Sequence, residues 1–139
     1  MLVNYKKTSV SIIIITILMF ILSTVWNLYL VDFFIPEPIP NLRPEMLHSS
    51  ILIGYLLLSI LMGIAYQFYT VDLPILKKGI SFGIFIALIW IVPANIILHG
   101  VFIVPDFTLY IDISWGLVEQ GLGGLTMAYI MDSEIKILA

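Results

Sequence analysis

The chain has 139 residues, of which 61% are hydrophobic and only 11% are charged. This composition lies outside the range of soluble globular domains and predicts an integral membrane protein with the lipid bilayer as its main partner. The formal net charge of -3 leaves no basic patch for nucleic acid, and the lack of cysteine excludes disulfides, thiolate catalysis and cysteine-ligated metal sites.

Four hydrophobic runs follow one another along the chain, at residues 8–31, 47–69, 79–101 and 109–131. Each is close to the roughly 20 residues that cross a bilayer as a helix. The runs are continuous rather than alternating, which favours helices over the strands of a membrane β-barrel. Because the connections are short, we expect residues 1–139 to form a single all-α membrane domain, an up-down-up-down bundle of four transmembrane helices.

The basic residues predict the orientation of these helices, because cytoplasmic loops of membrane proteins are enriched in lysine and arginine. Five of them fall on one side of the predicted bundle and only one on the other; the five are Lys6, Lys7, Lys77, Lys78 and Lys136, and the exception is Arg43. We therefore expect both termini to face the cytoplasm.

The first two runs carry polar residues near the outer side of the membrane. Asn27 lies one helical turn after Ser23 near the end of the first run, and His48 opens the second. A stripe of polar and small residues then follows the second run at helical spacing: His48, Tyr55, Ser59, Gly63 and Tyr66. Such residues usually form hydrogen bonds between membrane helices, so we interpret the stripe as interhelical packing.

The third run contains a proline followed by two polar residues. Asn95 and His99 lie one turn apart near its outer end and share a face, shortly after Pro93. Proline removes a backbone donor, which predicts a kink that could open a pocket beside Asn95. Proline is nevertheless tolerated in membrane helices, so the kink can also be without function.

The fourth run carries the most costly residues for a membrane span, in the segment SWGLVEQGLGG at positions 114–124. At helical spacing, Glu119 and Gln120 share a face with Gly116, Gly123 and Gly124, and this face should point into the bundle. The glycines predict a close helix-packing surface. An ionisable residue within a span is a functional candidate by default, although it can also be a neutral structural group.

The predicted topology brings polar residues of all four helices to a similar depth in the outer half of the membrane. We therefore predict an intramembrane polar cluster, whose members are Glu119, Gln120, Asn27, Asn95, His48 and His99. The two histidines leave a role as metal or haem ligands open, but they are not spaced on one helix as in the H-x3-H or HExxH motifs. We expect no metal and no cofactor.

The four-span plan and the segments KKGISFGIFIAL and WGLVEQGLGG resemble small uncharacterised prokaryotic inner-membrane proteins. The resemblance implies a multi-pass protein of the cytoplasmic (inner) membrane and supplies no functional residues. The chain departs from two better-known groups. It lacks the cysteine pair of the disulfide-generating four-helix enzymes, and its first run lacks the glutamate expected of small multidrug exporters.

The sequence contains no hydrolytic triad, phosphate-binding glycine loop or dense run of metal ligands, so we do not expect an enzyme. Two hypotheses of different classes remain. In the first, the chain is a structural or accessory subunit that packs in a larger membrane complex or homo-oligomer through the glycines of the fourth run. In the second, it is a small proton-coupled transporter or carrier in which Glu119 changes protonation. Small size favours the first, because four helices rarely enclose a pathway unless they dimerise.

Overall fold

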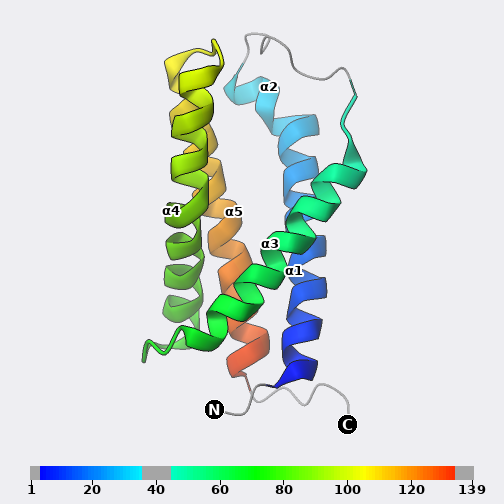
Figure 1. Ribbon diagram of the computed structural model, residues 1–139, viewed down its shortest axis with the longest axis vertical. Helices are drawn as coiled ribbons and strands as arrows, with labels where there is room; N and C mark the ends of the chain where they lie inside the picture. The colour runs from blue at the N-terminus through cyan, green and yellow to red at the C-terminus, as the bar shows by residue number, and fades with distance from the viewer. Residues whose placement is uncertain (1–3, 36–44, 134–139) are drawn as a thin grey trace.

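The structure, a computed structural model, describes residues 4–35 and 45–133. Within them every regular element is helical (Figure 1): α1 (Tyr5–Val25), the π-helical turn η1 (Trp26–Leu30), α2 (Val31–Phe34), α3 (His48–Phe68), α4 (Ile75–Val101) and α5 (Asp106–Asp132). The first three elements follow one another without a break and form one long helix. The described residues thus contain four helices, at the places of the four hydrophobic runs, whereas Arg43 and Lys136 lie outside the described residues.

Three of these helices are long and apolar enough to cross a membrane: Tyr5–Phe34, His48–Phe68 and Ile75–Val101. Large apolar side chains are exposed along all three, as expected for helices whose outer faces contact lipid. The helix α5 is not among the three, because its glycines and the polar Glu119 and Gln120 make it less apolar. The chain is therefore a helical protein of the membrane type. Its least apolar helix is α5, which contains the buried Glu119.

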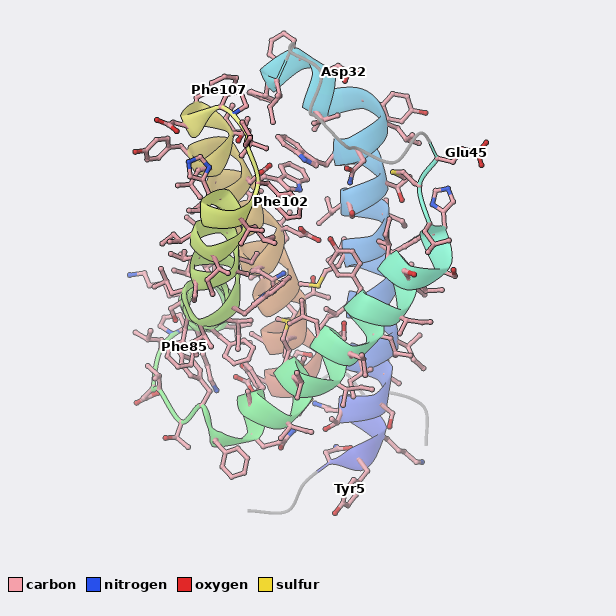
Figure 2. The ribbon with its side chains drawn as sticks, turned by 45° about the horizontal axis from the view of Figure 1, so that its top comes forward. Tyr5, Asp32, Glu45, Phe85, Phe102 and Phe107 are labelled. Carbon is pink, nitrogen blue, oxygen red and sulfur yellow. The ribbon has the colours of Figure 1, made fainter. Side chains whose placement is uncertain are left out.

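The helix α5 lies at the centre of the arrangement, with α4 against one side and α1 against the other (Figure 1). In contrast, α3 crosses α1 and α5 obliquely (Figures 1 and 2). The end of α3 reaches the beginning of α4, where the Tyr69 and Ser81 hydroxyl oxygens lie 2.9 Å apart and the rings of Tyr66 and Phe82 pack edge to face. The first turns of α3 lean away from α4, which departs from the near-parallel bundle predicted from the short connections.

Glycines bring α4 and α5 into backbone contact. A Cβ atom at Gly79 would lie 2.6 Å from the Cα atom of Leu125, and one at Gly83 would collide with the backbone of Gln120. On the facing helix, a Cβ atom at Gly124 would lie 2.5 Å from the carbonyl oxygen of Gly79. Only glycine permits this approach, and close packing of this kind is a main source of helix association in lipid.

The glycines of α3 explain why this helix does not join α4 in the same way. A Cβ atom at Gly63 would lie 3.1 Å from Ile12 of α1, and the space around Gly54 is open to 4 Å. The small residue of α3 that makes a close contact therefore faces α1. No second glycine surface holds α3 parallel to α4 in the described residues.

Polar side chains join all four helices at the end where α1 begins and α5 ends. Asp132 Oδ2 accepts hydrogen bonds from Tyr66 Oη at 2.8 Å and from Lys78 Nζ at 2.6 Å. Lys7 Nζ donates to the carbonyl oxygen of Ser133, where a cation is also favoured by the dipole of α5. We call this region, defined by Lys7, Tyr66, Lys78 and Asp132, the closed end.

The first helix changes its winding at η1, where the N–H group of Val31 donates to the carbonyl oxygen of Trp26. Such π-helical turns are rare and usually short. At this turn Trp26 stacks on Trp115 of α5, with ring centroids 4.8 Å apart, and on Phe34 at 5.7 Å. By contrast, α4 continues as one unbroken helix through Pro93.

Candidate functional site

The middle of α5 carries two buried polar side chains with unpartnered atoms. Glu119 is the central residue of this helix and is 5% exposed, and its Oε1 atom has no hydrogen-bond partner among the described residues. Gln120 is fully buried, and neither its Oε1 nor its Nε2 atom has a partner in the same part of the chain. Buried polar groups are nearly always hydrogen-bonded, and leaving one unpaired costs about 1–3 kcal/mol. The pair is therefore the candidate site.

Tyr55 of α3 lies near Glu119. Its hydroxyl group is close to both the Glu119 carboxyl group and the Ser23 hydroxyl group of α1. The sequence pointed to Tyr55 only as a member of the polar stripe, two helical turns after His48. The stripe was therefore the sequence signal for Tyr55. The sequence did not show which member of the stripe lies near Glu119.

The two asparagines of the predicted polar cluster are satisfied on their own helices. Asn27 Nδ2 donates to the carbonyl oxygen of Ser23 at 2.8 Å, and Asn95 Nδ2 donates to that of Ile91 at 3.0 Å. Asparagine often bonds to the backbone of the preceding turn in this way. Both amide groups therefore bond to their own helices, and the predicted cluster around Glu119 stays a prediction.

The two histidines of the predicted cluster also have other neighbours. His48 is exposed at the start of α3, and its ring packs edge to face with Phe20 at a centroid distance of 6.2 Å. His99 Nε2 lies 3.2 Å from Asp106 Oδ1, across the connection between α4 and α5. Each histidine is thus placed near a helix end. In the described residues, no three His, Cys, Asp or Glu side chains gather as a group that could hold a metal ion.

The three glycines predicted to pack are all buried within the chain itself. A Cβ atom at Gly116 would lie 2.5 Å from Ile91 of α4, and Gly123 faces the side chain of Met19 on α1. Gly124 meets the backbone of α4, as described above. These three glycines of α5 therefore contact α1 and α4 within the chain, and a role of this helix in binding another protein stays a prediction.

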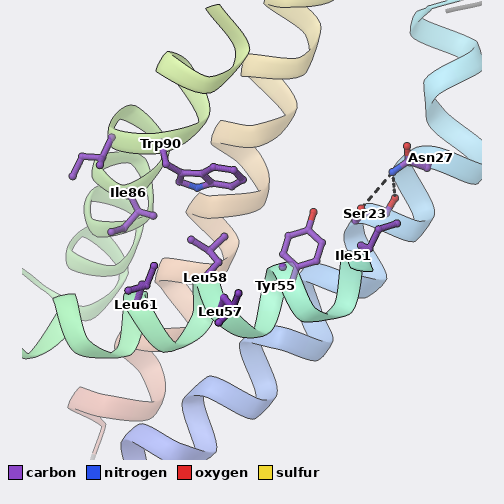
Figure 3. A pocket seen from close by; sticks show the side chains of 11 residues that line it. Ser23, Asn27, Ile51, Tyr55, Leu57, Leu58, Leu61, Ile86 and Trp90 are labelled. Atoms are coloured by element: carbon purple, nitrogen blue, oxygen red, sulfur yellow. Dashed lines mark hydrogen bonds between the residues drawn. The ribbon is translucent and has the colours of Figure 1, made fainter. Parts of the chain in front are cut away.

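A cleft of about 720 Å³ opens between α1, α3 and α4, on the side where α3 leans away (Figure 3). Trp90 points into it from α4, while Ser23 and Asn27 lie on the α1 side and Tyr55 rises from α3 between them (Figure 3). The remaining lining is almost entirely apolar and comprises Ile51, Gly54, Leu57, Leu58, Leu61, Ile86 and Ile89. The cleft is thus apolar along most of its walls and polar at the end nearest Tyr55.

Chemically, this arrangement offers a buried acid behind a tyrosine at the polar end of an apolar cleft. A carboxyl group in such a place can hold a proton or attract a cation. Comparison with known proteins adds no assignment, since no family model, curated protein or solved structure matches the chain.

Proposed function

We propose that the chain is a small membrane carrier in which Glu119 binds and releases a proton as a ligand or ion passes. The observation that carries this proposal is the unpartnered, buried carboxyl oxygen in the middle of α5. A membrane protein tolerates such a group at considerable cost, which is why an ionisable residue inside a helix bundle is a functional candidate. Tyr55, which lies near the acid, lines the cleft, so the cleft reaches close to Glu119.

The proposed carrier has four membrane passes in the cytoplasmic membrane, with both termini in the cytoplasm. The closed end supports this orientation, because Lys7 and Lys78 both lie there and lysine is enriched on cytoplasmic sides. Four helices enclose little space, so the carrier is proposed to act as a homo-oligomer. As the fourth pass, α5 is proposed to be shielded from lipid by its neighbours, which suits its lower apolarity.

The test is proton movement in sealed vesicles that contain the purified protein and a pH-sensitive dye. A pH gradient should relax faster with the wild-type protein than in empty vesicles, and Glu119→Gln should remove this difference. Glu45→Gln is the matched control, because Glu45 is an exposed acid outside the helices. Equal proton movement with wild-type protein and Glu119→Gln would contradict the proposal.

A second candidate function is that of an accessory subunit in a membrane complex. The observation that favours it is the exposed apolar face of α3, which includes Ile53, Leu57 and Leu61. Native mass spectrometry after gentle extraction separates the two functions, because it reports partners, copy number and bound cofactor together. A homo-oligomer without added mass supports the carrier, whereas a larger hetero-assembly supports the subunit.

A further inference from the structure

The cleft between α1, α3 and α4 has the size and lining of a site for a small amphiphilic molecule. Its volume of about 720 Å³ falls within the range of small-molecule pockets, roughly 300–1,000 Å³. Leu57, Leu61 and Trp90 line the cleft and are also exposed, so its wall continues into the apolar outer surface of the helices. A ligand can therefore enter sideways from an apolar phase such as lipid.

Among the described residues, no basic side chain lines the polar end of the cleft. Ser23, Asn27 and Tyr55 line this end, and the hydroxyl group of Tyr55 lies near the carboxyl group of Glu119, which is buried outside the lining. The ion pairs found in the described residues do not include Glu119. Tyr55 carries a hydroxyl group and supplies no cation. No ion pair within the described residues complements an ionised Glu119, and a bound cation would supply that charge.

We propose that this cleft binds a lipophilic organic cation, with its ammonium group at Glu119 and Tyr55 and its apolar part against the leucine and isoleucine walls. Trp90 adds an aromatic face, which attracts organic cations. This proposal rests on the proposed role of Glu119 and names the class of ligand for the same site.

Charge balance defines how such a cation would be exchanged. The neutral Glu119 carboxyl group releases its proton to water as the cation binds, and the O–H bond is replaced by an ion pair between carboxylate and ammonium. The net charge of the buried site stays the same in both states. This matters because an uncompensated charge in a low-dielectric interior is far more costly than a paired one.

The experiment is calorimetric titration of the full-length protein in dodecyl maltoside micelles, which carry no charge. The probe is octyltrimethylammonium, whose fixed charge means that any proton released comes from the protein, and octanol is the neutral probe of similar length. Titration in two buffers of different ionisation enthalpy gives the number of protons released. We expect octyltrimethylammonium to bind more tightly than octanol and to release about one proton per cation.

Three variants distinguish binding in the cleft from nonspecific binding of the probes. Glu119→Gln should weaken octyltrimethylammonium binding about tenfold or more and abolish proton release, because a buried charge pair contributes much more than an exposed one. Leu57→Trp should weaken binding of both probes by filling the cleft without touching the acid. Glu45→Gln should change neither the affinity nor the proton count.

The outcomes distinguish this inference from the proposed function. Equal affinity for octanol and octyltrimethylammonium, with no effect of Glu119→Gln, would show a site for neutral lipid chains and overturn the inference. Proton movement in vesicles without cation binding would overturn the inference and leave the carrier proposal standing. Cation binding with proton release, but without proton movement in vesicles, would support the inference and overturn the carrier proposal.

Discussion

Polar side chains are hydrogen-bonded at the closed end but are left with unpartnered atoms in the middle of α5. At the closed end, Asp132 accepts hydrogen bonds from α3 and α4, and Lys7 joins α1 to the end of α5. In the middle of the same helix α5, Glu119 and Gln120 are buried with unpartnered atoms. Paired polar groups stabilise a fold, whereas unpaired ones lower its stability and are typical of sites that serve another purpose. The comparison therefore separates the end of the molecule where polar groups hold the helices together from the middle of α5, where we propose the functional site.

The largest expected effect comes from disrupting the close packing of α4 against α5, because both regions depend on this helix pair. Gly83→Ala places a Cβ atom against the backbone of Gln120, which cannot move aside as a side chain could. We expect a loss of about 3 kcal/mol in the free energy of unfolding, the upper end of the usual cost of overpacking. The measurement is loss of helical circular dichroism during titration with a denaturing detergent. Gly121→Ala is the control and should be nearly silent, because nothing lies within 4 Å of its added Cβ atom.

A smaller loss is expected from opening the closed end. Asp132→Ala removes the acceptor of both Tyr66 and Lys78, and hydrogen bonds to charged groups contribute about 1.5–3 kcal/mol. We expect about 2 kcal/mol of destabilisation in the same titration, reduced at high salt because the ion pair is partly exposed. In the Lys78→Ala background, the further effect of Asp132→Ala should be smaller. Equal effects in both backgrounds would show that the two residues are not coupled.

The difference between paired and unpaired polar groups is tested most directly by changing one glutamine to methionine in each region. Gln120→Met removes an amide without partners and should raise the free energy of unfolding by about 1 kcal/mol, since methionine has a similar length and needs no hydrogen bonds. Gln67→Met should lower it, because Gln67 Nε2 donates to Thr8 Oγ1 at 3.1 Å near the closed end. If both substitutions changed the free energy of unfolding in the same direction, the distinction between the two regions would be wrong.

The smallest expected effect concerns the C-terminus of α5. Lys7→Ala removes a cation from the last carbonyl groups of this helix and should cost about 0.5–1 kcal/mol at low salt. The neighbouring Lys6 is exposed and provides the control, since Lys6→Ala should change the unfolding titration little. If both lysines proved equivalent, the contact between α1 and the end of α5 would contribute nothing specific.

Much of the fold could be predicted because membrane helices are governed by length and apolarity. The helix α3, for example, begins at His48 and ends at Phe68, close to the predicted span 47–69. The inward face of α5 was also predictable, because Glu119, Gln120 and the glycines share one side of a helix and are buried together. These predictions depend on neighbours in sequence, whose geometry within a helix is nearly constant.

The candidate site was only partly predictable. Glu119 stood out as an acid in an apolar segment, but its neighbour proved to be Tyr55, while Asn27 and Asn95 turned to carbonyl groups of their own helices. An asparagine side chain has equally good partners one turn away and across a helix interface, so sequence cannot choose between them. The same holds for helix irregularity, since α4 passes through Pro93 unbroken while the first helix, without a proline, forms a π-helical turn at Trp26.

By itself, the sequence determined that this chain is helical and of the membrane type, and that an acid lies on the inward face of its fourth helix. Only the tertiary structure decided that the glycines of α5 pack inside the chain, that α3 crosses obliquely and that a cleft opens beside Tyr55. The reason is physical. Apolarity and helical periodicity are local properties of the chain, whereas crossing angles and clefts follow from which small surfaces meet between helices that are distant in sequence.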